Sequence, residues 1–209
     1  MLSRKVIVGR EFISPVELET IAEKFLSEHH PTLEIPIPIE EIVEFDLGLD
    51  IIPIPGLYRD FNIESWLSHN QRSIYVDLRQ CEEMETRYRF TLAHEVGHLL
   101  LHSDVYAGIS LNSLEDWLAF HDRLDPTLRD NLEWQARSLA GRILVPATPL
   151  VHQAQTLIDR MKSRLPKSYD HEALLGAMSI PLGDTFNVHE EVVRIRLSGD
   201  KIGARISFD

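Results

Sequence analysis

The sequence predicts an α+β protein in which a small antiparallel sheet borders a helical core and a helical extension follows at the carboxyl end. Two observations predict this class. Residues 49–77 hold short runs of β-forming side chains between turn signals, and from Glu83 onward apolar residues recur at three-to-four spacing. The 209 residues, 44% of them hydrophobic, are enough for one large domain with an appendage. We therefore expect a main domain over residues 1–146 and a helical subdomain over 147–209 packed on it.

The amino-terminal third is predicted to hold two helices and the sheet. Ser14 suits an N-cap, Pro15 the first helical position and Glu17 the acidic first turn, so a helix is expected from about 15 to 28. The prolines of IPIPIEEIVEFDLGLDIIPIPG indicate a short helix near 38–47 and a strand near 49–54. The segments LYRDFNIESWLS and RSIYVDL then predict an antiparallel hairpin before residue 80.

The remainder reads as helical. A long helix carries the string FTLAHEVGHLLLH, and a loop followed by a second helix is expected over 103–124. A buried helix after Pro126 ends at Pro146, because Leu132 and later apolar residues form one stripe until that proline. Another helix is expected near 148–164, then a last helical pattern broken by Gly183 and Gly199.

Charge and cysteine content restrict the classes of partner. The chain has 21 Lys and Arg against 33 Asp and Glu, and a net charge of −12 disfavours nucleic acid and anionic lipid. The first residues contain no signal-peptide pattern, and no stretch approaches about 18 apolar residues, so we expect a cytoplasmic protein without a membrane partner. Cys81 is the single cysteine, and its acidic neighbours argue against a nucleophilic thiol.

The tail LGDTFNVHEEVVRIRLSGDKIG has a pattern similar to a helix-turn-helix. Its charge argues against DNA, because residues 151–209 hold eight basic and eight acidic side chains, and Glu190 and Glu191 would lie in the recognition helix. We expect this subdomain to pack on the main domain or on a protein partner and not to bind nucleic acid directly.

The segment HEVGH, with His94, Glu95 and His98, is a motif typical of zinc metallopeptidases. Imidazoles four positions apart project from one face of a helix and can reach a single ion, whereas Glu95 is rotated by about 100° toward a metal-bound water. Apolar residues behind the histidines provide the dry surroundings that a surface motif would lack. We predict a zinc ion on His94 and His98, with Glu95 as the catalytic base.

A tetrahedral catalytic zinc needs a third protein ligand and keeps its fourth position for water. Glu133 lies on a separate helix at the edge of an apolar stripe, which lets its carboxylate point inward beside the core. Asp116 and Glu115, on the intervening helix, are the alternatives.

Three further residues are candidates for supporting roles. His102 lies about 12 Å along the helix from His94, too far for both to bind one ion, so it is expected to hydrogen-bond within the fold, to support a ligand or to line the substrate site. Tyr106 and His121, between the two metal helices, are candidate donors to the oxyanion of a tetrahedral intermediate.

The strings RFTLAHEVGHLLLH at 89–102 and LEWQARSLAGRILVP at 132–146 resemble the ImmA/IrrE family of bacterial metallo-endopeptidases. Its members carry an FTLAHELGHLLLH-like helix and a later E-x-x-A-N-x-F-A-x-x-L-L-M-P-like helix. The resemblance spans about residues 14–200 and is strongest over 88–146. It implies a zincin-type, gluzincin-like core with Zn²⁺ as cofactor, Glu133 as third ligand, and a regulatory protein such as a repressor or antitoxin as substrate. Arg137 stands where the family usually has Asn, and Gly141-Arg142 where a small-acidic pair is common.

The sequence therefore predicts a zinc-dependent endopeptidase that works by metal-activated water, and the resemblance implies a regulatory protein as its substrate. The alternative is a non-catalytic, metal-containing regulatory module that acts by binding a partner protein. Glu95 favours the enzyme, because a purely structural metal site has no use for a base beside an open coordination position.

Overall fold

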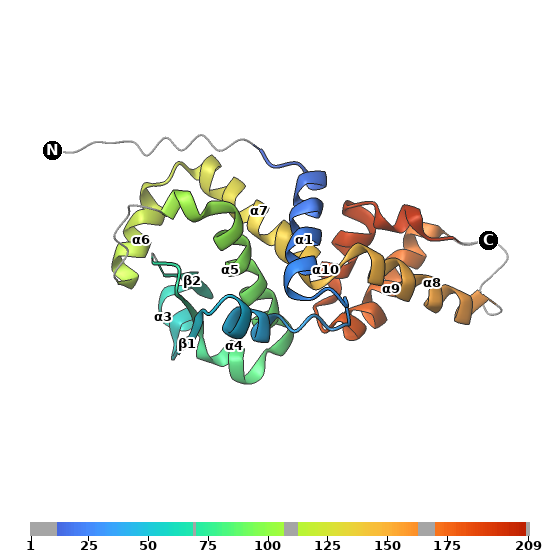
Figure 1. Cartoon of the computed structure of the whole chain (residues 1–209), viewed down its shortest axis with the longest axis horizontal. Coiled ribbons are helices and arrows are strands. Elements are labelled where there is room, and N and C mark those ends of the chain that lie inside the picture. The colour runs from blue at the N-terminus through green and yellow to red at the C-terminus, as the bar shows by residue number, and fades with distance from the viewer. Residues whose placement is uncertain (1–11, 69, 107–112, 163–169, 208–209) are drawn as a thin grey trace.

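The computed structural model describes residues 12–68, 70–106, 113–162 and 170–207, and these form the predicted α+β fold (Figure 1). The amino-terminal part holds α1 (Pro15–His29), α2 (Ile39–Glu41) with the π-helical turn η1 (Ile42–Asp46), β1 (Asp50–Ile54), α3 (Leu57–Phe61), β2 (Ser65–Leu67) and β3 (Ser73–Asp77). The helices α4 (Leu78–Glu83), α5 (Glu85–Tyr106), α6 (Leu114–Arg123), α7 (Pro126–Leu144) and α8 (Ala147–Met161) follow. The carboxyl-terminal part holds α9 (His171–Phe186), α10 (Glu190–Arg194), η3 (Ile195–Gly199) and η4 (Ile202–Arg205).

The start of α1 agrees closely with the sequence prediction. Ser14 is the N-cap and Pro15 opens the helix. The Ser14 hydroxyl accepts from the backbone N–H of Glu17, whose carboxylate in turn accepts from the backbone N–H of Ser14. Two backbone donors that the helix leaves unpaired are thereby satisfied.

The sheet has three strands in the order β1-β3-β2, and its pairing is mixed. β2 and β3 form the predicted antiparallel hairpin, with Trp66 opposite Tyr75. The expectation that the whole sheet is antiparallel is wrong for β1, which runs parallel to β3 with Asp50 opposite Ser73. The reason is the strand order: β3 lies between β1 and β2, and the chain reverses direction before β2 and again in the hairpin turn, so β3 runs in the direction of β1.

Helices α5 and α7 pack against each other at the centre of the molecule, and Gly97 sets their separation. A Cβ atom on Gly97 would lie 2.8 Å from the carbonyl oxygen of Ala136 and 3.0 Å from its Cα. Around this crossing, side chains such as Leu92 and Leu139 are fully buried. The two helices that carry the predicted metal ligands therefore approach to backbone contact, which only a residue without a side chain permits.

The carboxyl-terminal helices pack on the main body, because a single cluster of buried apolar side chains extends from Leu18 on α1 through α5 and α7 to Phe186 and Leu197. Gly183 lies inside α9 and does not break it, contrary to the prediction. A Cβ there would lie 3.0 Å from the carbonyl oxygen of Val188, so the glycine allows the chain entering α10 to approach the α9 backbone. Gly199 ends η3, as expected.

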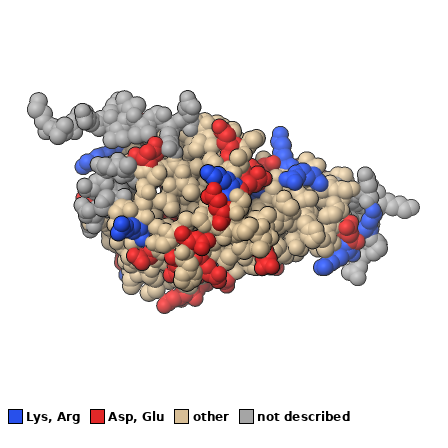
Figure 2. Space-filling model, viewed as in Figure 1, with Lys and Arg blue, Asp and Glu red and all other residues tan. Residues whose placement is uncertain are grey.

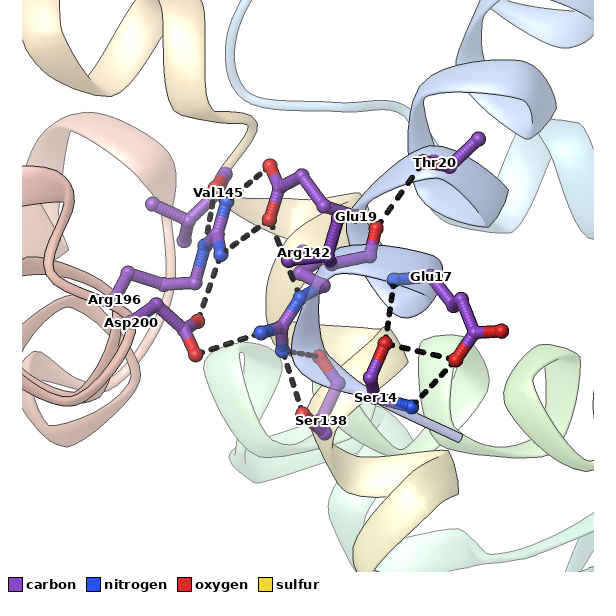
Figure 3. A network of polar contacts seen from close by, with 10 residues as sticks. Ser14, Glu17, Glu19, Thr20, Ser138, Arg142, Val145, Arg196 and Asp200 are labelled. Atoms are coloured by element: carbon purple, nitrogen blue, oxygen red, sulfur yellow. Dashed lines mark hydrogen bonds and ion pairs between the residues drawn. The ribbon is translucent and has the colours of Figure 1, made fainter. Parts of the chain in front are cut away.

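Four buried or half-buried charges tie α1, α7 and η3 together (Figure 3). Glu19 lies between the guanidinium groups of Arg142 and Arg196, with N···O distances of 3.2 and 2.8 Å. Asp200 contacts the same two arginines at 2.6 and 2.7 Å. Since the arginine side chains are only 2% and 1% exposed, each depends on these carboxylates to offset the loss of hydration.

Acidic side chains cluster on one part of the described surface. On the face shown in Figure 2, Asp and Glu side chains gather along the lower side of the part that carries the sheet. No helix in the described ranges is both long and apolar enough to span a membrane.

Candidate metal centre

His94 and His98 lie one turn apart on α5 and turn their rings toward each other. Their Nε2 atoms are 3.0 Å apart, and the ring planes meet at 83°. Both side chains are mostly buried, with 15% and 6% of their surface exposed. The one-turn spacing predicted from the sequence thus brings two imidazole nitrogens to the same point.

Glu133 reaches this point from α7. Its Oε2 atom is 3.4 Å from His94 Nε2, and its Oε1 atom is 3.4 Å from His98 Nε2. Neighbouring ligand atoms of a tetrahedral zinc lie about 3.3–3.5 Å apart, as follows from bond lengths of about 2.0–2.2 Å. The two distances to Glu133 match this spacing, the 3.0 Å between the histidine nitrogens is a few tenths of an ångström shorter, and two imidazoles with a carboxylate are a donor set that suits this ion. Within the described ranges they are the one group of His, Cys, Asp and Glu side chains arranged to hold a metal.

The electrostatics of the three side chains favour a cation between them. Burial alone would raise the pKa of the Glu133 carboxyl, but hydrogen bonds from His94 and His98 outweigh burial and hold this pKa far below its ordinary value. Burial alone would likewise lower the pKa of His94, yet the hydrogen bond to Glu133 and the charge of Glu95 raise it. Both shifts show that Glu133 draws positive charge to this point.

Glu95 lies next to the donor group without joining it. The residue is only 4% exposed, and its Oε1 atom accepts a hydrogen bond of 2.5 Å from the hydroxyl of Ser65 on β2. One carboxylate oxygen is thereby held by the sheet. No local pattern in the sequence pointed to Ser65, which precedes Glu95 by 30 residues and belongs to a different element.

His102 is fully buried and lies behind His98. Its Nδ1 atom is 3.0 Å from His98 Nδ1, and its Nε2 atom is 3.0 Å from Oε1 of Gln135 on α7. It does not belong to the group that could hold an ion, and its burial excludes a place in the wall of the pocket. Gln135 was not singled out from the sequence, although a polar residue beside an apolar stripe and two positions after Glu133 was a usable signal.

Of the remaining candidate site residues, the structure describes the side chain of one and not those of the other three. Asp116 is exposed on α6 and lies outside the donor group, so the structure does not place it with the histidines. Glu115, Tyr106 and His121 belong to α6 or to the end of α5, but their side chains lie outside the described part of the structure. A role for Tyr106 or His121 toward an oxyanion therefore stays a prediction.

A pocket of about 510 Å³ opens over the donor group. It is lined by β2 and the residues leading into it, by α5, by α7 and by Trp117 of α6. Arg137 also lines it, with a guanidinium nitrogen 3.4 Å from Glu133 Oε2. The residue that departs from the ImmA/IrrE pattern here thus lies at the pocket, whereas the second departure, Arg142, belongs to the buried ion cluster.

Comparisons with known proteins give the family and a related fold. The family model of the IrrE N-terminal-like domain (Peptidase_M78) matches residues 54–198, which include β2, α5 and α7. A solved structure of a Mycobacterium tuberculosis transcriptional regulator has a similar fold, with a TM-score of 0.55 and 18% sequence identity over 88% of this chain. The matched region spans 46% of that regulator's chain, so this chain corresponds to about half of it. No curated protein matches the chain.

Proposed function

The chain belongs to the IrrE N-terminal-like domain family, and from this premise we propose that it is a zinc-dependent endopeptidase acting on a regulatory protein. The observation that carries the proposal is a buried carboxylate, Glu95, that lies beside a group of three metal donors without belonging to it and lines the same pocket. His94, His98 and Glu133 would hold the ion. When bound, zinc supplies a Lewis acid that makes water acidic near neutral pH and polarises the scissile carbonyl.

Glu95 would act as the general base and then as the general acid. Its carboxylate can take a proton from the attacking water and later deliver it to the leaving amine. The Ser65 hydroxyl occupies Oε1, so the other oxygen, Oε2, is the one offered to the reacting atoms. Because the side chain is 96% buried, this carboxylate has little freedom to turn away from the pocket.

A protein substrate suits the shape of the pocket. β2 is at an edge of the sheet, next to the donor group, and the residues from Asn62 to Leu67 line the pocket. An edge strand presents unpaired backbone groups that an extended peptide can bind by adding a strand. A volume of about 510 Å³ would accept a few side chains of such a segment.

We further propose that the substrate is a repressor or antitoxin. This rests on the resemblance to the ImmA/IrrE endopeptidases and on the solved structure of similar fold, which is described as a transcriptional regulator. The rival is a module that keeps the metal and acts by binding its partner. Glu95 argues for the enzyme, because a binding module does not need a base at this position.

The Glu95→Gln variant tests the choice. Gln keeps the size of the side chain and can still bond to Ser65, so zinc content and folding should match the wild type while proton acceptance is lost. Purified zinc-loaded wild type and variant are each added to a lysate of the source cells, and newly formed protein amino termini are labelled and identified by mass spectrometry. We expect new termini from wild type only, with a rate at least about 100-fold lower for the variant.

Equal sets of new termini from wild type and Glu95→Gln would refute the assigned base. No new terminus from either protein, together with an undiminished regulatory effect of the variant in cells, would support the binding module instead.

A further inference from the structure

We propose that Arg137 binds a carboxylate of the substrate, so that the pocket selects proteins with an Asp or Glu side chain close to the cleaved bond. The inference names the class of substrate for the site described above and therefore rests on the proposed function. It concerns a charged side chain to which that function gives no role.

Arg137 lies on the same face of α7 as the donor Glu133. The two residues are one helical turn apart, and both line the pocket. A guanidinium nitrogen of Arg137 is 3.4 Å from Glu133 Oε2, and the Arg137 side chain is 64% exposed. A ligand in the pocket can therefore reach this guanidinium, and a carboxylate bound to it would lie close to the donor group.

Glu133 contacts Arg137 without satisfying it. Glu133 Oε1 is 3.4 Å from His98 Nε2, and Oε2, the atom that Arg137 contacts, is also 3.4 Å from His94 Nε2. The contact with Arg137 is made by one nitrogen at a distance longer than usual for a hydrogen bond. Since a guanidinium carries several N–H donors in a fork that matches a carboxylate, Arg137 retains the capacity to bind one more.

The other carboxylates that line the pocket already have partners of their own. These pairs are Glu64 with Arg87, Glu95 with Ser65, and Asp130 with Arg129. In the part of the chain that the structure describes, none of these carboxylates lies within hydrogen-bond or ion-pair distance of Arg137. The pocket thus provides a guanidinium whose counter-ion has to come from a ligand.

A guanidinium at this place would give the pocket a preference that the sheet cannot give. A peptide bound to an edge strand such as β2 gains affinity from backbone hydrogen bonds, which are the same for every sequence, so selectivity comes from side chains along the pocket. Residues of an extended peptide follow one another at about 3.4 Å, so an acidic residue within about two positions of the cleaved bond would reach Arg137.

The test uses two libraries of short peptides that separate the two sources of a carboxylate. In the first library, randomised peptides are acetylated and amidated at their ends, so that Asp and Glu side chains are the only carboxylates. The second library lacks Asp and Glu but has free carboxyl termini. Each library is incubated with the zinc-loaded full chain, and the cleaved bonds are identified by mass spectrometry.

Three variants are compared with wild type at full zinc occupancy. Arg137→Gln removes the charge and keeps a polar side chain, whereas Arg137→Lys keeps the charge and removes the fork. Arg160→Gln is the matched control, because it changes the net charge by the same amount at an exposed position on α8 that does not line the pocket.

We expect wild type to prefer peptides of the first library with Asp or Glu near the cleaved bond over those with Asn or Gln there by about five- to tenfold. This lies between the effect of an exposed ion pair and that of a hydrogen bond to a charged group. Arg137→Gln should abolish the preference, Arg137→Lys should keep part of it, and Arg160→Gln should keep all of it. In the second library, cleavage should not concentrate near the carboxyl terminus.

Equal cleavage of acidic and amide peptides by wild type, an undiminished preference in Arg137→Gln, or an equal loss in Arg160→Gln would overturn the inference. Cleavage confined to the carboxyl ends of the second library would also overturn it, because Arg137 would then bind a terminal carboxylate.

A wild type that cleaves neither library would refute the proposed function, and a measurement without cleavage then decides the inference. The zinc-loaded Glu95→Gln chain is immobilised, and the peptides that it retains from the first library are sequenced. Enrichment of Asp and Glu that disappears when Arg137→Gln is added would support the carboxylate site. Retention without this enrichment, or no retention, would overturn it.

Discussion

Gly97→Ala is the substitution that should most directly separate the two halves of the metal site. The new methyl group would lie 2.8 Å from the Ala136 carbonyl oxygen, against about 3.4 Å for an ordinary contact of this kind. The contact is with backbone, so no side chain can rotate away and α7 itself must move by about 0.6 Å to restore ordinary contact. Glu133, less than one turn before Ala136, must move with it. Metal–ligand distances tolerate only about 0.2 Å, so the donor from α7 would leave the position that fits zinc.

The expected effect on stability follows from two opposed contributions. Overpacking costs about 1–3 kcal/mol, and a clash with backbone belongs at the upper end of that range. The better helix propensity of alanine raises the free energy of unfolding by up to about 1 kcal/mol and so offsets part of this loss. The free energy of unfolding of Gly97→Ala should therefore fall by about 2 kcal/mol, and zinc affinity should fall by at least about tenfold.

Urea unfolding and chelator competition measure these two quantities, and Gly176→Ala is the matched control. Gly176 lies within α9, and a Cβ atom there would have no neighbour within 4 Å. This second substitution should raise the free energy of unfolding by about 0.5–1 kcal/mol and leave zinc affinity unchanged. If Gly97→Ala behaves like Gly176→Ala in both measurements, the close crossing of α5 and α7 does not set the geometry of the donors.

Two further predictions concern hydrogen bonds and charges on other elements. Glu19→Gln leaves two buried arginines facing a single carboxylate, so it should lower the free energy of unfolding by about 3–5 kcal/mol in a urea titration. The control is Glu191→Gln, which removes an exposed ion pair with Arg194 and should lower the same free energy by less than about 1 kcal/mol. Similar losses for both would show that the buried cluster contributes no more than a surface pair. Ser65→Ala frees Glu95 Oε1 and should reduce kcat about tenfold with little change in zinc content; full activity in this variant would show that Ser65 does not orient the base.

The features predicted correctly from the sequence are those encoded within a few consecutive residues. The capping box at Ser14 and Glu17, the one-turn spacing of His94 and His98, and the helix ended by Pro146 all depend on local spacing. The inward placement of Glu133 followed from its position at the edge of an apolar stripe, a helical pattern that is again local.

What the sequence did not predict depends on contacts between distant segments. The parallel pairing of β1 results from its place beside β3 instead of β2, next to which the Asp77 carboxylate of β3 accepts a hydrogen bond from the Tyr58 N–H of α3. The hydrogen bonds of Ser65 to Glu95 and of His102 to Gln135 cross 30 and 33 residues. Residue types alone do not show which distant polar groups will meet, because this depends on how the elements pack.

The ion cluster of Figure 3 also has a consequence for how the protein is made. Glu19 and Arg196 are 177 residues apart, and at about 5–20 residues per second a ribosome needs roughly 10–35 s to synthesise the intervening chain. During that interval α1 has been made and Arg142 follows, but Arg196, the second of the two guanidinium groups that hold the Glu19 carboxylate, has not been added. The first helix can therefore reach its final environment only at a late stage of translation, and the growing chain must remain unaggregated while that carboxylate stays in water.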